Sequence, residues 1–390
     1  MLNANVRRFF RNVLTATCMT AASLMTAPSV AQPASASSVP TTLFAHEWDA
    51  FKQRYMASDG RIVDIEKGGL THSEGQGYGM ILAVKADDRD AFERIASFTL
   101  RSLRARKDHL SGWLYDPRGA GRVTDTNNAT DGDIMIAYSL VQAALKWNDG
   151  RYLALATPII DDIGRLLLVR NGAHVLVRPG AAGFDQTDGQ VVNLSYFVYG
   201  ALLLFSQVND DYPFFEAWQS GLQLTEQAMH TGHRVAPDWV SVTRTGAMGQ
   251  RHRMPKKSSY DAVRIPLYMM LGGRVPTRYV APFDRAWNIE GNRIPKDVDL
   301  GKTRTDTDMN DSGYRAIAAL AACATRNVPI PAALQQFRTT TYFASALHLM
   351  TLSAAREHYP HCTQGAPAVA PSAPVHVSYA VASSAAFRMR

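Results

Sequence analysis

The stretch that decides the fold is His72-Ser73-Glu74-Gly75-Gln76-Gly77-Tyr78-Gly79-Met80, which runs directly into the apolar residues Ile81-Leu82-Ala83-Val84. Glycine permits close approach to the backbone, so we expect a ligand to come near Glu74. The tyrosine and the apolar residues around Glu74 suit a carboxyl group that keeps its proton, as a general acid must. A helix-capping turn with an ordinary surface glutamate is the alternative, and this stretch alone favours neither interpretation.

Helical periodicity continues from this stretch in both directions. Apolar residues recur three and four positions apart, which predicts helices. We expect roughly a dozen of them: 44–55, 75–84, 92–99, 134–147, 152–169, 195–208, 214–229, 260–271, 279–287, 313–323, 332–337 and 341–358. Only 173–177 is typical of a short strand. The pattern predicts one all-α domain, not two. Its polar motifs fall in turns, as in a helical barrel with function on the loops at one end.

The two ends of the chain differ in composition from the middle. Residues 1–31 carry three arginines, a mostly apolar centre and a small-residue Ser29-Val30-Ala31 site, which is typical of an export signal. The apolar centre is shorter than the roughly 20 residues that a membrane span requires, so we expect no span after signal removal and a periplasmic or secreted protein. The predicted division is 1–31 signal, 32–40 linker, 41–362 catalytic domain and 363–390 disordered Ala/Pro/Ser-rich tail.

Charge and motif content exclude several classes of partner. The formal charge of +7 falls close to neutrality once the signal and the tail are set aside. Nucleic-acid binding needs a concentrated cationic face, so we expect no nucleic-acid partner. The sequence contains no Cys/His spacing of the zinc type, no phosphate loop and no dinucleotide-binding glycine motif. No metal and no organic cofactor is therefore expected.

Two cysteines, Cys323 and Cys362, remain after removal of the signal, which contains Cys18. Export to an oxidising compartment permits a disulfide between them. Nothing in the sequence fixes the distance between the two positions, so the interpretation that we favour is two buried free thiols.

Two further polar blocks supply candidate acids. The block 124–133 carries three aspartates before an apolar helix, although a cap needs only one. We expect Asp133 to cap this helix and Asp131 to bind sugar hydroxyls. In the block 258–266, Asp261 and Arg264 are three apart and face each other on a helix. An exposed ion pair would be worth little, but the apolar neighbours favour a partly dry cleft where Arg264 keeps Asp261 ionised, as a general base requires.

Aromatic residues accompany the same loops. A hexose presents apolar C–H faces rimmed by hydroxyls, which flat rings beside carboxylates match. Core packing is the commoner role for any one such ring, and for Trp239 we give core and cleft equal weight. The candidates are Trp113, Tyr115, Tyr196, Trp239 and Tyr260. The histidines show no ligand spacing, and His72 is expected to be structural.

Five motifs in order now resemble glycoside hydrolase family 8: HSEGQGYGM at 72–80, NNATDGD at 127–133, NLSY at 193–196, PDW at 237–239 and SYDAVR at 259–264. The resemblance covers about 41–359 and is strongest to periplasmic endoglucanases encoded with bacterial cellulose synthases. It implies an (α/α)6 barrel of six helical hairpins with an open cleft for a β-1,4-linked glucan. It also implies a monomer, with the cellulose synthase machinery as a candidate partner.

The resemblance assigns roles residue by residue. Glu74 matches the family's general acid, Asp261 its general base, and Asp131 the carboxylate that holds the distorted sugar. Arg264 matches the arginine that supports the base, and Tyr196 matches a tyrosine of the same subsite. The position of the base varies among the family's subgroups.

Three aromatic residues complete the expected substrate contacts. Trp113 matches a stacking tryptophan, and Tyr260 adjoins the base. The family's last motif usually has paired tyrosines, where this chain has Tyr342-Phe343, so a substrate contact by Tyr342 is left open.

The family inverts configuration, which implies roughly 6.5–9.5 Å between the two catalytic carboxyls, enough to admit a water molecule. The first alternative keeps the enzyme but changes the glycan to chitosan, xylan or mixed-linkage glucan. The second is a weakly catalytic glucan-binding partner of a polymer-export complex. A helical scaffold protein is a third, which the clustered carboxylates disfavour.

Overall fold

The computed structural model describes residues 44–119, 122–230, 234–289, 291–301 and 306–363. The expected signal and linker, and the tail beyond residue 363, lie outside the described residues. Within them the chain forms twelve α-helices, in agreement with the number expected. No helix of the described part is both long enough and apolar enough to cross a membrane.

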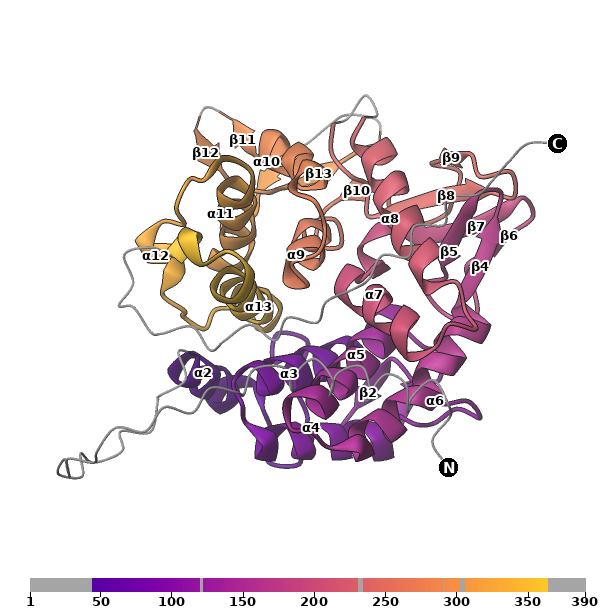
Figure 1. Ribbon diagram of the computed structural model, residues 1–390, viewed down its shortest axis with the longest axis vertical. Helices are drawn as coiled ribbons and strands as arrows, with labels where there is room; N and C mark the ends of the chain where they lie inside the picture. Colours follow the sequence, from indigo (N-terminus) through magenta and orange to yellow (C-terminus); the bar gives the residue numbers. More distant parts are fainter. Residues whose placement is uncertain (1–43, 120–121, 231–233, 290, 302–305, 364–390) are drawn as a thin grey trace, which may run out of the picture. The chain divides into compact units, whose positions relative to one another are not determined.

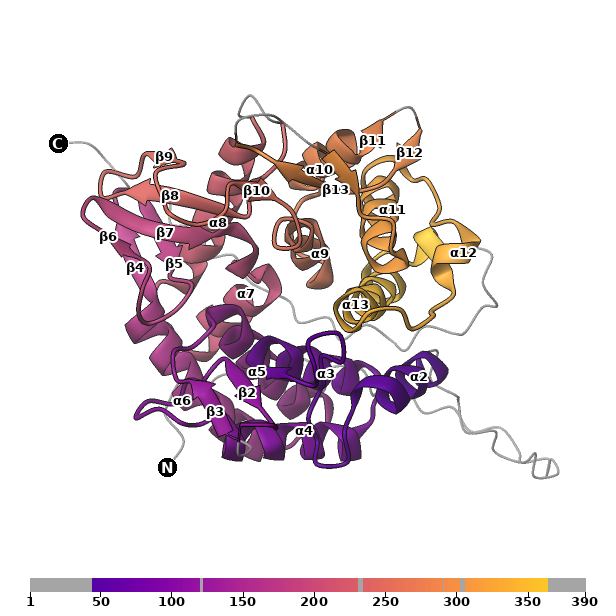
Figure 2. The same cartoon turned by 180° about the vertical axis from the view of Figure 1, so that it is seen from behind.

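Six of these helices form a closed inner ring (Figures 1 and 2). Each packs against the next along the chain, and the last packs back on the first. All eight residues of one of them, α9 (Arg264–Leu271), are buried, as expected of a helix surrounded by protein. The ring consists of α3 (Ser73–Lys85), α5 (Thr130–Lys146), α7 (Tyr199–Val208), α9 (Arg264–Leu271), α11 (Ser312–Arg326) and α13 (Tyr342–His358).

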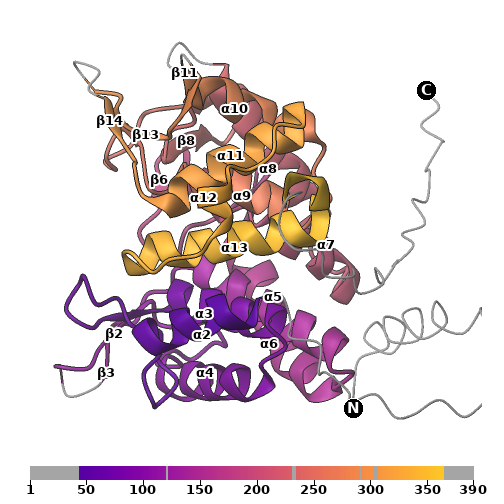
Figure 3. The ribbon, with the colours of Figure 1, turned by 90° about the vertical axis from the view of Figure 1, so that its left-hand side faces the viewer.

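The other six helices form an outer layer. In α4, Phe92, Ile95, Ala96 and Thr99 form the buried stripe that their spacing predicts. Helix α4 packs on α3, α6 on α5, α8 on α7, α10 and α12 on α11, and α2 on α13. Figure 3 shows α13 beside α2 and α3. The predicted (α/α)6 barrel is thereby confirmed. The outer helices are α2 (Ala45–Tyr55), α4 (Arg89–Ser102), α6 (Gly150–Leu167), α8 (Phe214–Met229), α10 (Ala281–Trp287) and α12 (Ala332–Gln335).

Two inner helices begin later than their apolar patterns predict. The expected helix 195–208 is interrupted, because the Asn193 side chain accepts hydrogen bonds from the Ser195 amide and hydroxyl and holds a short 3₁₀ turn, η1 (Leu194–Tyr196). The expected helix 260–271 starts only at Arg264. In both cases the residues that were predicted to begin the helix form a turn before it.

Strands are more numerous than expected. The predicted strand at 173–177 is confirmed as β5 (His174–Val177), which pairs with β4 (Leu168–Asn171). The others have two to five residues, too few for a periodic signal. They form antiparallel groups: β1 (Thr71–His72), β2 (Leu114–Asp116) and β3 (Arg122–Asp125); β6 (Asp185–Gln186), β7 (Gly189–Asn193), β8 (Trp239–Thr243) and β9 (Met248–Gly249); β10 (Lys257–Ser258), β13 (Lys296–Asp299) and β14 (Asp306–Asp308); and β11 (Asn288–Ile289) with β12 (Asn292–Arg293).

These short sheets position the starts of the inner helices. Strand β1 runs directly into α3, and β7 runs directly into η1 ahead of α7. Strand β10 ends one residue before the turn that precedes α9.

The glycines of the opening motif lie inside α3, where they make room for neighbouring protein. A Cβ at Gly75 would overlap the hydroxyl of Tyr342, and one at Gly77 would lie 2.5 Å from the Cβ of Met135. Small residues here let α3 approach α5 and α13 closely, which brings the starts of these helices together.

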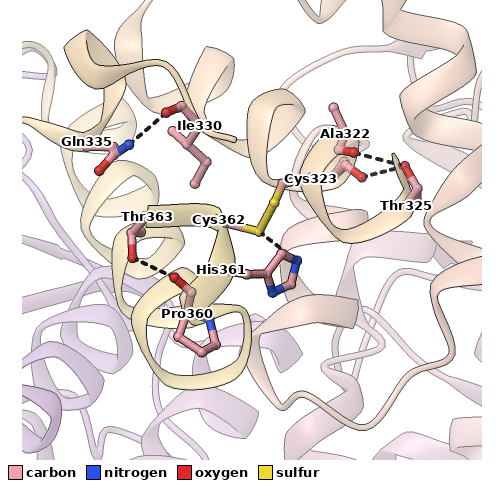
Figure 4. The surroundings of a disulfide bond; sticks show 10 residues. Ala322, Cys323, Thr325, Ile330, Gln335, Pro360, His361, Cys362 and Thr363 are labelled. Atoms are coloured by element: carbon pink, nitrogen blue, oxygen red, sulfur yellow. Dashed lines mark hydrogen bonds between the residues drawn. A yellow bond between two sulfur atoms is a disulfide. The ribbon is translucent and has the colours of Figure 1, made fainter. Parts of the chain in front are cut away.

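The expectation of two free thiols is wrong. Cys323 near the end of α11 and Cys362 in η3 (Pro360–Thr363) form a disulfide, with their Cα atoms 5.8 Å apart (Figure 4). Both cysteines are buried, as expected. Helices α11 and α13 pack side by side and run in the same direction, which brings the end of α11 close to the residues that follow α13. Spacing in the sequence does not reveal this.

Loss of this disulfide is expected to lower the free energy of unfolding by about 2–4 kcal/mol, because the bond closes a long loop in the unfolded chain. Urea unfolding of the oxidised and the dithiothreitol-treated protein measures the difference. The double variant Cys323→Ala/Cys362→Ala is the control, since it should unfold like the reduced protein and ignore the reductant. Equal midpoints for the oxidised and reduced protein would show that the bond contributes nothing.

Candidate active site

The polar residues singled out by the motifs gather where inner helices begin. Glu74 and Asp131 are the second residues of α3 and α5, and Arg264 and Tyr342 are the first residues of α9 and α13. Unpaired N–H groups at helix starts carry partial positive charge, which favours carboxylates there.

Arg264 holds the three predicted acids together. Its side chain is 2% exposed. Nη1 donates to the carboxylate of Glu74 and, over 3.0 Å, to Asp131 Oδ2. Nη2 donates to the carboxylate of Asp261 and, over 2.9 Å, to Ser195 Oγ. The expected pairing of Arg264 with Asp261 is confirmed, and the arginine of the pair is buried. The bonds from the same guanidinium to Glu74 and Asp131 were not expected.

Three carboxyl groups around one guanidinium leave an excess of negative charge. Asp131 is 2% exposed, and burial together with the adjacent, hydrogen-bonded Glu74 raises its pKa. Asp131 therefore retains a proton more readily than an isolated carboxyl would.

Solvent reaches the three acids unequally. The side chains of Glu74 and Asp261 are 20% and 28% exposed, whereas that of Asp131 is covered. Glu74 and Asp261 bind different terminal nitrogens of Arg264. A ligand from solvent therefore has access to both, with the guanidinium between them.

The expected cap by Asp133 is wrong. The start of α5 has no side-chain cap, and Asp133 is fully buried instead. Its two carboxyl oxygens accept hydrogen bonds from the Ser111 amide at 2.7 Å and the Asn128 side chain at 2.9 Å. Burial raises the pKa of Asp133 to about 7. Asp133 thus ties the loop before β2 to the residues that lead into α5.

Tyr196 and Trp239 lie beside the cluster. The guanidinium of Arg264 is 5.9 Å from the centre of the Tyr196 ring, and Trp239 is 6.2 Å from that ring. Phe184 stacks on Trp239 with planes 3° apart. Both Trp239 and Phe184 are only partly buried. Phe184 was not predicted, since it stands in an irregular loop without a motif.

Trp113 lies beside the start of α3. Its carbonyl accepts from the Ser73 amide over 3.0 Å, and its ring stacks on His72 at 5.8 Å. The Nε1 of Trp113 donates to Asp125 over 2.7 Å. Burial lowers the pKa of His72, which agrees with a structural histidine. Tyr115 packs edge-on against Phe98.

The two remaining predicted tyrosines differ in exposure. Tyr260 is 51% exposed and packs its edge against Tyr314 at 5.7 Å. Tyr342 is 3% exposed, and its hydroxyl has no hydrogen-bond partner.

A buried hydroxyl pair lies behind Arg264. Tyr78 OH is 3.4 Å from Arg264 Nη1 and 2.5 Å from Tyr268 OH. Burial raises the pKa of both tyrosines, so both keep their protons. Tyr78 stood in the opening motif without an assigned role, and nothing marked Tyr268.

One group among the described residues has the composition of a metal site. Cys323, Cys362 and His361 lie close together. The disulfide removes both thiolates, so this group cannot bind a metal ion while the bond is intact.

Comparisons with known proteins show the family of the chain. The model of Glycosyl hydrolases family 8 matches residues 12–357. A "Probable endoglucanase" of Novacetimonas hansenii is 35% identical over 276 residues, which cover 70% of this chain and 81% of the relative. An "Endoglucanase" of Cellulomonas uda is 35% identical over 236 residues, covering 59% of this chain and 64% of the relative. The solved structure of an endo-β-1,4-glucanase from Acetobacter xylinum superposes with a TM-score of 0.71 at 32% identity, covering 82% of this chain and 99% of that one.

Proposed function

Because the chain belongs to glycosyl hydrolase family 8, we propose that it is an endoglucanase that hydrolyses internal β-1,4-glucosidic bonds of cellulose or a related β-glucan. The observation that carries the proposal is the cluster of Glu74, Asp131 and Asp261 on the buried Arg264. Glycoside hydrolysis requires one carboxyl group that gives a proton and a second that acts on the opposite face of the sugar. The relatives named endoglucanase support the choice of a β-glucan as substrate.

Glu74 is the proposed general acid. Its partly exposed carboxyl gives a proton to the glycosidic oxygen as the bond from that oxygen to the anomeric carbon breaks. After transfer, the Glu74 carboxylate is stabilised by Arg264 Nη1.

Asp261 is the proposed general base. Its carboxylate takes a proton from a water molecule whose oxygen attacks the anomeric carbon from the face opposite the leaving group, so configuration inverts. Arg264 Nη2 donates a hydrogen bond to this carboxylate and holds it in place. A separation of roughly 6.5–9.5 Å between the carboxyls, as inverting enzymes need, stays a prediction.

Asp131 and the aromatic rings are proposed to bind the sugar. Hydrogen bonds from sugar hydroxyls to Asp131 would strengthen as the ring flattens towards an oxocarbenium-like state, which lowers the barrier. Tyr196, Trp113 and Tyr260 offer ring faces to the apolar sides of glucosyl units.

We extend the proposal to the biological setting on the strength of the motif resemblance. The export pattern in 1–31 supports action in the periplasm or outside the cell. Trimming of newly made glucan beside a cellulose synthase would suit that location, with the enzyme acting as a monomer.

The test compares carboxymethylcellulose, mixed-linkage β-glucan, xylan and chitosan as substrates. Viscosity and reducing ends are followed together, because internal cleavage lowers viscosity before many reducing ends appear. We expect the largest rate on carboxymethylcellulose or mixed-linkage glucan, with this endo pattern. Binding to β-glucan without new reducing ends would favour the glucan-binding alternative, and a faster rate on chitosan or xylan would correct the substrate.

A further inference from the structure

Asp238 joins two segments of the chain at the proposed base. It precedes β8 and is 7% exposed. A single oxygen, Oδ1, accepts hydrogen bonds from the Ser259 amide at 2.7 Å and the Ala262 amide at 2.9 Å. These amides stand on either side of Asp261 in the chain, so one carboxyl group grips the turn that carries the proposed base.

Ser259 and Ala262 precede helix α9, so their amides have no acceptor within that helix and need one from elsewhere. The side-chain oxygen of Asp238 accepts from these amides as an N-cap side chain accepts from the first amides of a helix, although Asp238 lies 21 positions before Ser259. The same residue also donates its own amide to the Lys257 carbonyl over 2.7 Å. Asp238 is thus tied to the approach to the turn as well as to the turn itself.

The paired strands β8 and β7 also lead to Arg264, the arginine that binds Asp261. Trp239, next to Asp238, pairs with Asn193 across β8 and β7. The Asn193 side chain accepts from Ser195, whose hydroxyl oxygen accepts from Arg264 Nη2. Adjacent ends of two paired strands therefore hold both Asp261 and the guanidinium that binds it.

We propose that Asp238 is a positioning residue for the general base: by holding the turn 259–262 it keeps the Asp261 carboxylate aligned on Arg264 and on the attacking water. The inference rests on the proposed function, since Asp261 must be the base. Both hydrogen bonds that the Asp238 Oδ1 accepts come from protein amides of this turn, so Asp238 acts on the substrate only through Asp261.

The grip does not require a negative charge. Burial and the charge of the nearby Asp261 raise the pKa of Asp238. A protonated carboxyl group still offers Oδ1 as an acceptor, and so does the amide of asparagine. Asparagine should therefore replace Asp238, whereas alanine leaves two amides without their acceptor and frees the turn.

The experiment is a double-mutant cycle between Asp238→Ala and Asp261→Ala. Rates are measured on a dinitrophenyl cellobioside, whose reactive leaving group keeps slow variants measurable. Displacement of a catalytic group by about 1 Å costs about 10²-fold. We expect Asp238→Ala to lower kcat by about that factor, with KM changed less than about threefold, and Asp238→Asn to retain kcat within about fivefold. In the Asp261→Ala background, Asp238→Ala should cost less than about twofold, because the residue through which it acts is gone.

Asp133→Ala is the matched control, since Asp133 is also a buried aspartate that accepts from a loop amide, but of Ser111. Any loss of kcat that it causes should persist in the Asp261→Ala background. Thermal unfolding and circular dichroism establish that each variant is folded, and Asp238→Ser replaces Asp238→Ala in the cycle if the alanine variant is not.

Three results would overturn the inference: an unimpaired Asp238→Ala, an asparagine variant as slow as the alanine variant, or a full Asp238→Ala loss in the Asp261→Ala background. If Asp261→Ala is impaired and Asp238→Ala is not, only this inference fails. An unimpaired Asp261→Ala would overturn the assignment of the base, and this inference with it.

Discussion

Glu74→Gln is expected to lower kcat/KM on cellohexaose by about 10³-fold, within the range that general acid catalysis supplies. Glutamine preserves the size of the side chain and an oxygen for Arg264 Nη1 but has no acidic proton to give. Binding should change little, so most of the loss is expected in kcat. Reducing-end release under initial-rate conditions measures it.

The leaving group decides whether this loss reflects proton donation. Dinitrophenolate departs without protonation, so Glu74→Gln should lose less than about tenfold on dinitrophenyl cellobioside. Asp261→Asn should be slow on both substrates, because a better leaving group does not activate the water. Glu93→Gln, on the exposed part of α4, controls for loss of a carboxylate elsewhere. An equal loss for Glu74→Gln on both substrates would remove Glu74 from the role of acid.

Arg264→Met is expected to lower kcat/KM by about 10³-fold or more, because Arg264 binds all three acids of the site. Methionine leaves three neighbouring carboxyls without their cation, which disfavours the ionised base that the reaction needs. Arg264→Lys should recover little, since an ammonium group cannot reproduce the five hydrogen bonds that the two planar guanidinium nitrogens donate. Initial rates and thermal unfolding of the three proteins test this.

Arg326→Met provides the matched control for loss of a forked ion pair. Arg326 donates to both carboxyl oxygens of Asp284, at 2.6 and 2.9 Å, and contacts none of the site residues. Its removal should lower stability and leave kcat/KM within about twofold. A lysine variant at 264 with near-normal activity would show that charge alone is required there.

The sequence predicts local features of this site better than distant ones. The spacing of Asp261 and Arg264 is enough to predict their pairing, because it depends only on helical geometry. The contacts of Arg264 with Glu74 and Asp131 cross 190 and 133 positions. They arise from closure of the barrel, which no local pattern reports.

The failed expectations have the same origin. A cap was predicted for Asp133 because a helix follows it, yet a loop 22 positions earlier supplies its donor. Free thiols were favoured for Cys323 and Cys362 because the sequence does not reveal that the end of α11 lies beside the residues after α13. The grip of Asp238 on the turn around Asp261 likewise joins segments that are unrelated in sequence.

The anomer released in the first turnovers tests the central claim most directly, namely that Glu74 and Asp261 act through a water molecule on opposite faces of the sugar. Proton NMR of cellohexaose hydrolysis, recorded before mutarotation, identifies the configuration of the new reducing end. Inversion at a β-linkage predicts that the α-anomer appears first and the β-anomer grows in later. Initial appearance of the β-anomer would contradict the account, because it would require a covalent intermediate on one of these carboxylates.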